Sequence, residues 1–116
     1  MDVTHLRDSA RNLRIDAEAR RKDAAKASDR AAEYSRQNDE SRAQAAKSEA
    51  ATLNDQAAEL ESRAVAVENE ASDKEKRVAE IEQRQAALEA DFKRQMDGLE
   101  KEKQNLIGVS PTNLLF

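Results

Sequence analysis

Ser35-Arg-Gln-Asn-Asp-Glu-Ser-Arg42 is the stretch on which the fold of this chain depends. It carries no apolar side chain, and it separates two long segments in which apolar residues recur at helical spacing. A helix that passes through it makes the chain one continuous rod, whereas a turn within Gln37-Asn-Asp-Glu40 makes an antiparallel pair of helices. Asn and Asp tolerate turn conformations, but the stretch contains no Gly or Pro, and the two arms would be unequal. We therefore predict a continuous helix and keep the hairpin as the alternative.

The segments on both sides of this stretch have the composition of helices. Ala, Glu, Lys, Arg, Gln and Leu dominate them, and Gly98 is the only Gly or Pro before Gly108. Charged residues make up 38% of the chain and aromatic residues 3%, and the mean hydropathy is −0.97. Between Asp16 and Thr52 there is no Leu, Ile, Val, Met or Phe for a globular core. This composition predicts an elongated helix that buries a narrow stripe against another helix.

Apolar residues in both segments follow heptad frames, with alternating spacings of three and four. The first frame consists of Val3, Leu6, Ala10, Leu13, Ala17, Ala24, Ala27, Ala31 and Tyr34. The second consists of Leu53, Ala57, Leu60, Ala64, Val67, Ala71, Val78, Ile81, Leu88, Phe92, Leu99 and Leu106. The frames are out of phase, but Ala24 and Ala57 are separated by a multiple of eleven residues, a period that straightens a supercoil. The Ala-rich middle, residues 24–57, is therefore expected to join the frames within one helix.

These patterns predict an all-α fold. Residues 2–107 are expected to form one long, nearly continuous helix, capped at its start by Asp2 or Thr4. A lone helix of this length needs a partner, so we expect a parallel coiled coil of two or three copies. Acids four residues before bases, as in Glu18 and Lys22, support the helix. The predicted oligomerisation seam is Leu6, Leu13, Leu53, Leu60, Val67, Val78, Ile81, Leu88, Phe92, Leu99 and Leu106.

The chain ends in a different kind of sequence, Gly108-Val-Ser-Pro-Thr-Asn-Leu-Leu-Phe116. Gly suits the left-handed position that ends a helix, and Pro cannot continue one. Residues 108–116 are therefore predicted to be an extended, non-helical peptide with no charged side chain. We expect it to dock on a partner or a neighbouring subunit, with folding back onto the helices and a frayed end as the alternatives. The predicted docking residues are Val109, Pro111, Leu114, Leu115 and Phe116.

Few residues suggest chemistry at a site. The chain has no Cys, and His5 is its only His, so we expect no metal site, no cofactor and no catalytic residue. Basic and acidic residues are well mixed at a net charge of −4, and no nucleic-acid partner is expected. No apolar run reaches the length of a membrane span, and the first residues do not read as a signal peptide. We expect a cytoplasmic protein that is not an enzyme.

The first fifteen residues also fit a weaker hypothesis, that of an amphipathic helix on an anionic membrane. One face would be apolar and three arginines would flank it. Ala10 and the acidic residues Asp2 and Asp8 argue against this hypothesis, so the same face is expected to begin the coiled coil. The residues concerned are Val3, Leu6, Ala10, Leu13, Arg7, Arg11 and Arg14.

The layout of a charged helical body over residues 2–107 and the terminal Val109-Ser-Pro-Thr-Asn-Leu-Leu-Phe116 resembles that of small virion-associated or scaffolding proteins of tailed bacteriophages. The resemblance implies a helical rod that oligomerises and holds a shell or tail component, and it implies a virion location. Docking segments of scaffolds are frequently basic and this one is apolar, so a permanent head or tail rod fits equally. The expected function is that of a structural, self-associating rod or spacer. The alternative is a binding adaptor, formed by a hairpin or a coiled coil with a different chain.

Overall fold

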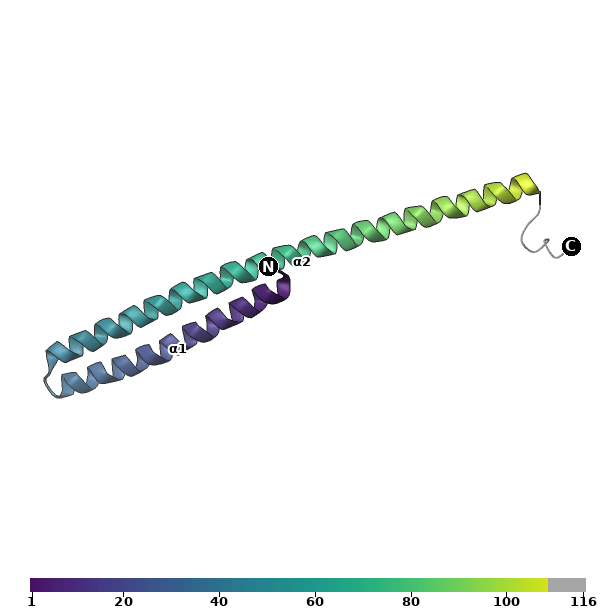
Figure 1. The fold of residues 1–116 in the computed structure, drawn as a ribbon. Coiled ribbons are helices and arrows are strands. Elements are labelled where there is room, and N and C mark those ends of the chain that lie inside the picture. Colours follow the sequence, from purple (N-terminus) through teal and green to yellow (C-terminus); the bar gives the residue numbers. More distant parts are fainter. Residues whose placement is uncertain (109–116) are drawn as a thin grey trace. The chain divides into compact units, whose positions relative to one another are not determined.

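The computed structural model describes residues 1–108, which form two α-helices (Figure 1). α1 comprises Val3–Arg36 and α2 comprises Glu40–Ile107. The chain divides into two compact units, Met1–Glu75 and Lys76–Phe116, and the boundary falls within α2. The first unit thus holds all of α1 and the first part of α2, while the second holds the rest of α2.

α1 begins where the sequence predicts it. Asp2 is the N-cap residue, and its Oδ1 accepts a hydrogen bond of 2.8 Å from the backbone N–H of His5. This bond satisfies one of the amides that the first turn leaves without a partner. It also lowers the pKa of the Asp2 carboxyl, because it favours the ionised form. Of the two predicted caps, Asp2 and Thr4, the structure uses Asp2.

The prediction of one continuous helix is wrong, because the chain turns between Arg36 and Glu40. The backbone N–H of Asp39 donates to the carbonyl of Tyr34 at 2.8 Å, and that of Asn38 donates to Ser35 at 3.1 Å. Asn38 has a φ of 59°, in the left-handed region. These two bonds around a left-handed residue form the Schellman motif that closes a helix.

The turn needs no Gly or Pro because Asn38 and Asp39 perform both functions required. Asn tolerates the left-handed conformation better than most residues, so Asn38 ends α1. Asp39 then begins α2, since its Oδ1 accepts the backbone N–H of Arg42 at 3.2 Å. The hairpin alternative, with its turn at residues 37–40, therefore describes the first unit.

Within the first unit, α1 and the beginning of α2 lie side by side and antiparallel (Figure 1). The residues buried between them are almost all Ala, and Ala recurs at every seventh position of both helices. Such small side chains let two helix backbones approach closely. The buried residues are Leu6, Ala10, Ala17, Ala24, Ala27 and Ala31 of α1, and Ala43, Ala46, Ala50, Ala57, Ala64 and Ala71 of α2.

The hairpin also explains why the two heptad frames are out of phase. The chain reverses between them, so no straight middle segment has to join their stripes. Two polar residues that interrupt the frames, Arg20 and Lys74, contact neighbours across the interface. Arg20 donates from Nη1 to Oε1 of Gln56 at 2.5 Å, and Lys74 donates from Nζ to the backbone carbonyl of Met1.

The second unit is described from Lys76 to Gly108, and in it α2 runs to Ile107. Gly108 has a φ of 81°, and its N–H donates to the carbonyl of Gln104 at 2.8 Å. A left-handed Gly immediately after a helix is a common way for the helix to end. The prediction that the helix stops at Gly108 is confirmed, whereas the predicted extended peptide, residues 109–116, lies outside the described residues.

Candidate interaction surface

The structure divides the predicted seam into a covered part and an exposed part. Its first five residues are buried or half-buried within the hairpin, so they contact the other helix of the same chain. They are Leu6, Leu13, Leu53, Leu60 and Val67. A parallel seam between copies along the whole chain is therefore wrong for this part, because its apolar surface is already used. The other six residues are exposed: Val78, Ile81, Leu88, Phe92, Leu99 and Leu106.

These six residues define what we call the α2 stripe, over residues 78–106. Leu88 exposes 69% of its surface, Phe92 65% and Leu106 82%. Large apolar side chains at heptad spacing on a helix face ordinarily pack against another helix. In the described chain nothing covers them, and this makes the stripe the strongest candidate for an interaction surface.

The α2 stripe continues a heptad position that the hairpin already uses. Going along α2 in steps of seven from Ala43, this position holds Ala as far as Ala71. From there it holds Val78, Gln85, Phe92, Leu99 and Leu106. The change from small to large side chains coincides with the end of the segment that α1 covers. Beyond that point the residues suit the wider spacing of an ordinary coiled coil.

Four ion pairs join α1 and α2 beside the Ala interface, and three of them recur every seven residues; the fourth joins Arg30 and Glu49 at 2.9 Å. Arg14 and Glu68 form a bidentate pair. The Nε of Arg14 donates to Oε1 of Glu68 at 2.8 Å, and its Nη2 donates to Oε2 at 3.0 Å. Arg21 and Glu61 repeat this arrangement at 2.9 Å and 3.0 Å. The third pair joins Arg7 and Glu75 at 2.8 Å. We call these three pairs the Arg–Glu ladder.

The Arg–Glu ladder specifies alignment more than it supplies stability. More than a third of each side chain is exposed, so water and salt weaken the attraction. The hydrogen bonds nevertheless lower the pKa of the Glu61 and Glu68 carboxyls and raise the pKa of Arg14 and Arg21. Sequence reasoning missed these pairs, because only the antiparallel turn brings them together. The signal was the seven-residue spacing in both helices.

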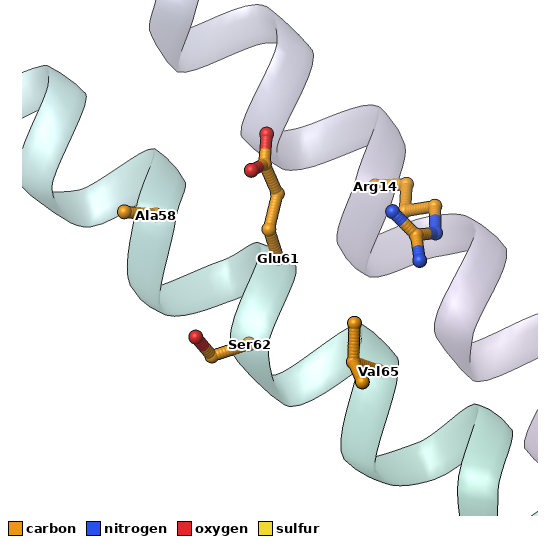
Figure 2. A pocket seen from close by; sticks show the side chains of 5 residues that line it. All are labelled: Arg14, Ala58, Glu61, Ser62 and Val65. Atoms are coloured by element: carbon orange, nitrogen blue, oxygen red, sulfur yellow. The ribbon is translucent and has the colours of Figure 1, made fainter.

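A shallow hollow lies beside the ladder, and Figure 2 shows the side chains that line it. Glu61 reaches from α2 toward α1, and Arg14 comes from α1, while Ala58, Ser62 and Val65 complete the lining. The two charged groups are engaged in the ladder, so Glu61 stays ionised and Arg14 stays protonated at neutral pH. Neither is available as a general acid or base in that state.

The remaining candidates for chemistry lie apart from one another. His5 is at the exposed start of α1, where its ring nitrogen lies 3.1 Å from the Asp2 carboxylate. Within residues 1–108, no three His, Cys, Asp or Glu side chains gather closely enough to hold a metal ion. Neither described helix has a stretch apolar enough to cross a bilayer.

The proposed membrane face of the first fifteen residues is turned toward α2 instead. Leu6 and Ala10 are buried, and Val3 and Leu13 are half-buried. Two of the three flanking arginines belong to the ladder, as described above. The membrane hypothesis thus has no free apolar face to rest on in the hairpin. The docking residues Val109, Pro111, Leu114, Leu115 and Phe116 lie outside the described residues.

Comparison with family models, with curated protein sequences and with solved structures found no match to this chain.

Proposed function

We propose that this chain is a non-enzymatic structural protein, a self-associating helical spacer that attaches to a larger assembly through its C-terminal apolar peptide. The exposed α2 stripe carries this proposal, because an isolated helix with uncovered Leu and Phe residues is poorly stable in water. Self-association belongs to residues 78–106, while residues 1–75 form a unit whose apolar seam is internal.

The test of self-association is substitution within the α2 stripe. Changing Leu88 and Phe92 together to Gln removes two apolar layers without adding charge. We expect the variant to sediment as a monomer at concentrations where the parent chain associates. The matched control changes Ala86 and Ala90 to Gln, at exposed positions outside the stripe, and should associate as the parent does. Equal masses for the parent and the stripe variant contradict the proposal.

Attachment through residues 109–116 is the second half of the proposal, and it is supported by the uncharged, apolar sequence. We further propose, from the resemblance to phage virion and scaffolding proteins, that the assembly is a phage head or tail. The chain would then be made in a cytoplasm and reside in the virion. A chain ending at Gly108 should keep its helicity and its oligomeric state but lose co-sedimentation with the phage particle. Retained co-sedimentation removes the docking role from the peptide, and lost helicity favours folding back.

The second candidate function is that of an adaptor whose stripe pairs with a different coiled-coil chain. Glu102 supports it, because this acid interrupts the α2 stripe where a second copy would bring a second Glu102. A partner with Lys or Arg at that layer would remove the repulsion. A parent chain that is monomeric alone and forms a one-to-one complex with such a helix would select the adaptor.

A further inference from the structure

We propose that the α2 stripe pairs with the same stripe of a second copy of this chain, with the two helices parallel and in register. The inference rests on the proposed self-association and names its partner, orientation and alignment.

Within residues 1–108, nothing covers the α2 stripe. The apolar seam of α1 is occupied, since its residues are buried against residues of α2 before Glu75. Residues 78–106 rise about 42 Å along the helix, and a second copy of the chain offers a stripe of the same length and the same heptad frame.

The charges beside the stripe favour a parallel partner. Each heptad of the stripe has two seam positions. Arg77 and Arg84 come directly before the first of them, residues 78 and 85. Glu82 and Glu89 come directly after the second, residues 81 and 88. In a parallel, in-register coiled coil, the residue before the first seam position lies opposite the residue five positions later in the other chain. Arg77 then faces Glu82 of the second copy and Arg84 faces Glu89, and symmetry doubles both pairs. None of these four side chains forms an ion pair with another of residues 1–108.

An antiparallel partner matches these charges less well. Residues 77, 84, 91, 98 and 105 lie on one flank of the stripe, and in an antiparallel pair this flank faces the same flank of the other chain. Asp91 is its only acid, so Arg77 and Arg84 would find few opposite charges. The Asp91 carboxylate already pairs with Arg94 of its own helix. The row of glutamates would likewise face itself, and its only base is Lys103. The hairpin shows that Arg–Glu pairs flanking a seam are how this chain aligns helices.

The heptad frame fixes the register. Gln85 and Gln95 are the two uncharged polar residues among the stripe positions, and in register each meets itself in the second copy. Two amides that face each other can hydrogen-bond, whereas a shift by one heptad would place Gln85 against Val78 or Phe92 and Gln95 against Leu88 or Glu102. In an antiparallel pair, by contrast, Gln85 would face Gln95. The two orientations therefore differ in which Gln meets which.

This difference gives the experiment. The chain has no Cys, so single Cys variants report contacts without interference. Gln85→Cys and Gln95→Cys are made separately in the full chain, oxidised in a glutathione buffer alone and as a mixture, and analysed by mass spectrometry of the linked peptides. The control is Gln83→Cys, on the opposite side of the helix. We expect crosslinks between like positions for 85 and 95, essentially none between 85 and 95, and little for 83.

Each other outcome overturns the inference in a recognisable way. Crosslinks formed chiefly between positions 85 and 95 show an antiparallel pair, and self-association stands. An associated but uncrosslinked protein shows another register or face. A chain that sediments as a monomer removes the proposed self-association as well.

A charge exchange provides an independent test of orientation. Arg84→Glu and Glu89→Arg should each weaken association by about two- to tenfold. Each substitution occurs in both copies, so it replaces two attractive contacts with two repulsive ones. The double exchange should restore the parent affinity. The matched control is the exchange of Glu80 and Lys101, at positions outside the stripe and its flanks. Failure of the double variant to restore affinity contradicts the parallel pairing.

Discussion

Asn38 lies in the turn that reverses the chain between α1 and α2. Among residues 1–108 it is the only residue other than Gly with a positive φ, and two backbone hydrogen bonds close α1 around it. Asp39 beside it starts α2. The choice between a rod and a hairpin is thus made by two adjacent polar side chains, in a stretch that contains no Gly or Pro.

Substitutions at Asn38 should report the left-handed conformation. Asn38→Val is expected to lower the free energy of unfolding by about 1–2 kcal/mol, because a branched side chain clashes in that region. Asn38→Gly should stay close to the parent. Urea denaturation followed by circular dichroism measures both. Asn54→Val, at an exposed helical position, is the control, and an equal loss there would show that the turn is not responsible.

The Arg–Glu ladder should make the hairpin sensitive to acid. The pKa values of Glu61 and Glu68 are lowered from 4.5 in the folded chain, chiefly by hydrogen bonds from Arg21 and Arg14. The stabilisation is therefore fully present above pH 4.5 and is lost as the pH falls through the lower, folded values. We expect the urea midpoint to fall in this range, and to fall less when both residues are changed to Gln.

The control for the acid experiment is the pair Glu59→Gln and Glu70→Gln. These carboxylates contact bases of their own helix, Arg63 and Lys74, each at 4.0 Å. Changing them should leave the dependence on pH close to that of the parent. An equal effect of both double variants would mean that the ladder has no special part in the acid response.

At the scale of the helices, the molecule changes its packing along α2. As far as Ala71 one heptad position of α2 holds only Ala, and four of these residues are completely buried: Ala43, Ala57, Ala64 and Ala71 each expose 0% of their surface. From Val78 onward the same heptad position carries larger side chains, all of them exposed, and Gln85 is the one polar residue among them within residues 78–106. The apolar periodicity was predictable from sequence throughout. What covers it was not, because helical periodicity is the same whether the partner is α1 or another chain.

Enlarging an Ala in the hairpin seam should separate the helices. Ala64→Leu inserts a branched side chain where none fits, and we expect a loss of about 1–3 kcal/mol in the free energy of unfolding. Ala66→Leu, two residues away on the exposed side, should change it by no more than about 0.5 kcal/mol. Chemical denaturation of both variants decides the matter. A tolerated Ala64→Leu would contradict close packing at this position.

At the scale of the whole molecule, the chain combines a unit with an internal seam and a unit with an exposed one. Met1–Glu75 buries its Ala seam within the chain, whereas the described part of Lys76–Phe116 leaves its stripe uncovered. The proposed spacer would use both properties, with one part independent and the other joining copies. The predicted seam therefore falls into two parts, and association of copies through the exposed part stays a prediction.

Glu102 offers a test of association at this scale. Glu102→Leu replaces two facing acids with an apolar layer in the proposed pair, so we expect at least tenfold tighter association by analytical ultracentrifugation. Asp97→Leu removes the same charge from the opposite side of the helix and is the control. Similar gains for both variants would show that net charge, rather than a shared layer, governs association.

The sequence by itself determined that this chain is helical, where its first helix begins, where its second ends at Gly108, and which residues form apolar stripes. These properties follow from local propensity, capping and periodicity, which neighbouring residues decide. Only the tertiary structure decided that α1 returns along α2, because continuous and reversed chains satisfy the same local rules over residues 35–42. The difference lies in one left-handed residue and in the packing that it permits. That reversal buries the Ala seam, assembles the Arg–Glu ladder and leaves the α2 stripe exposed.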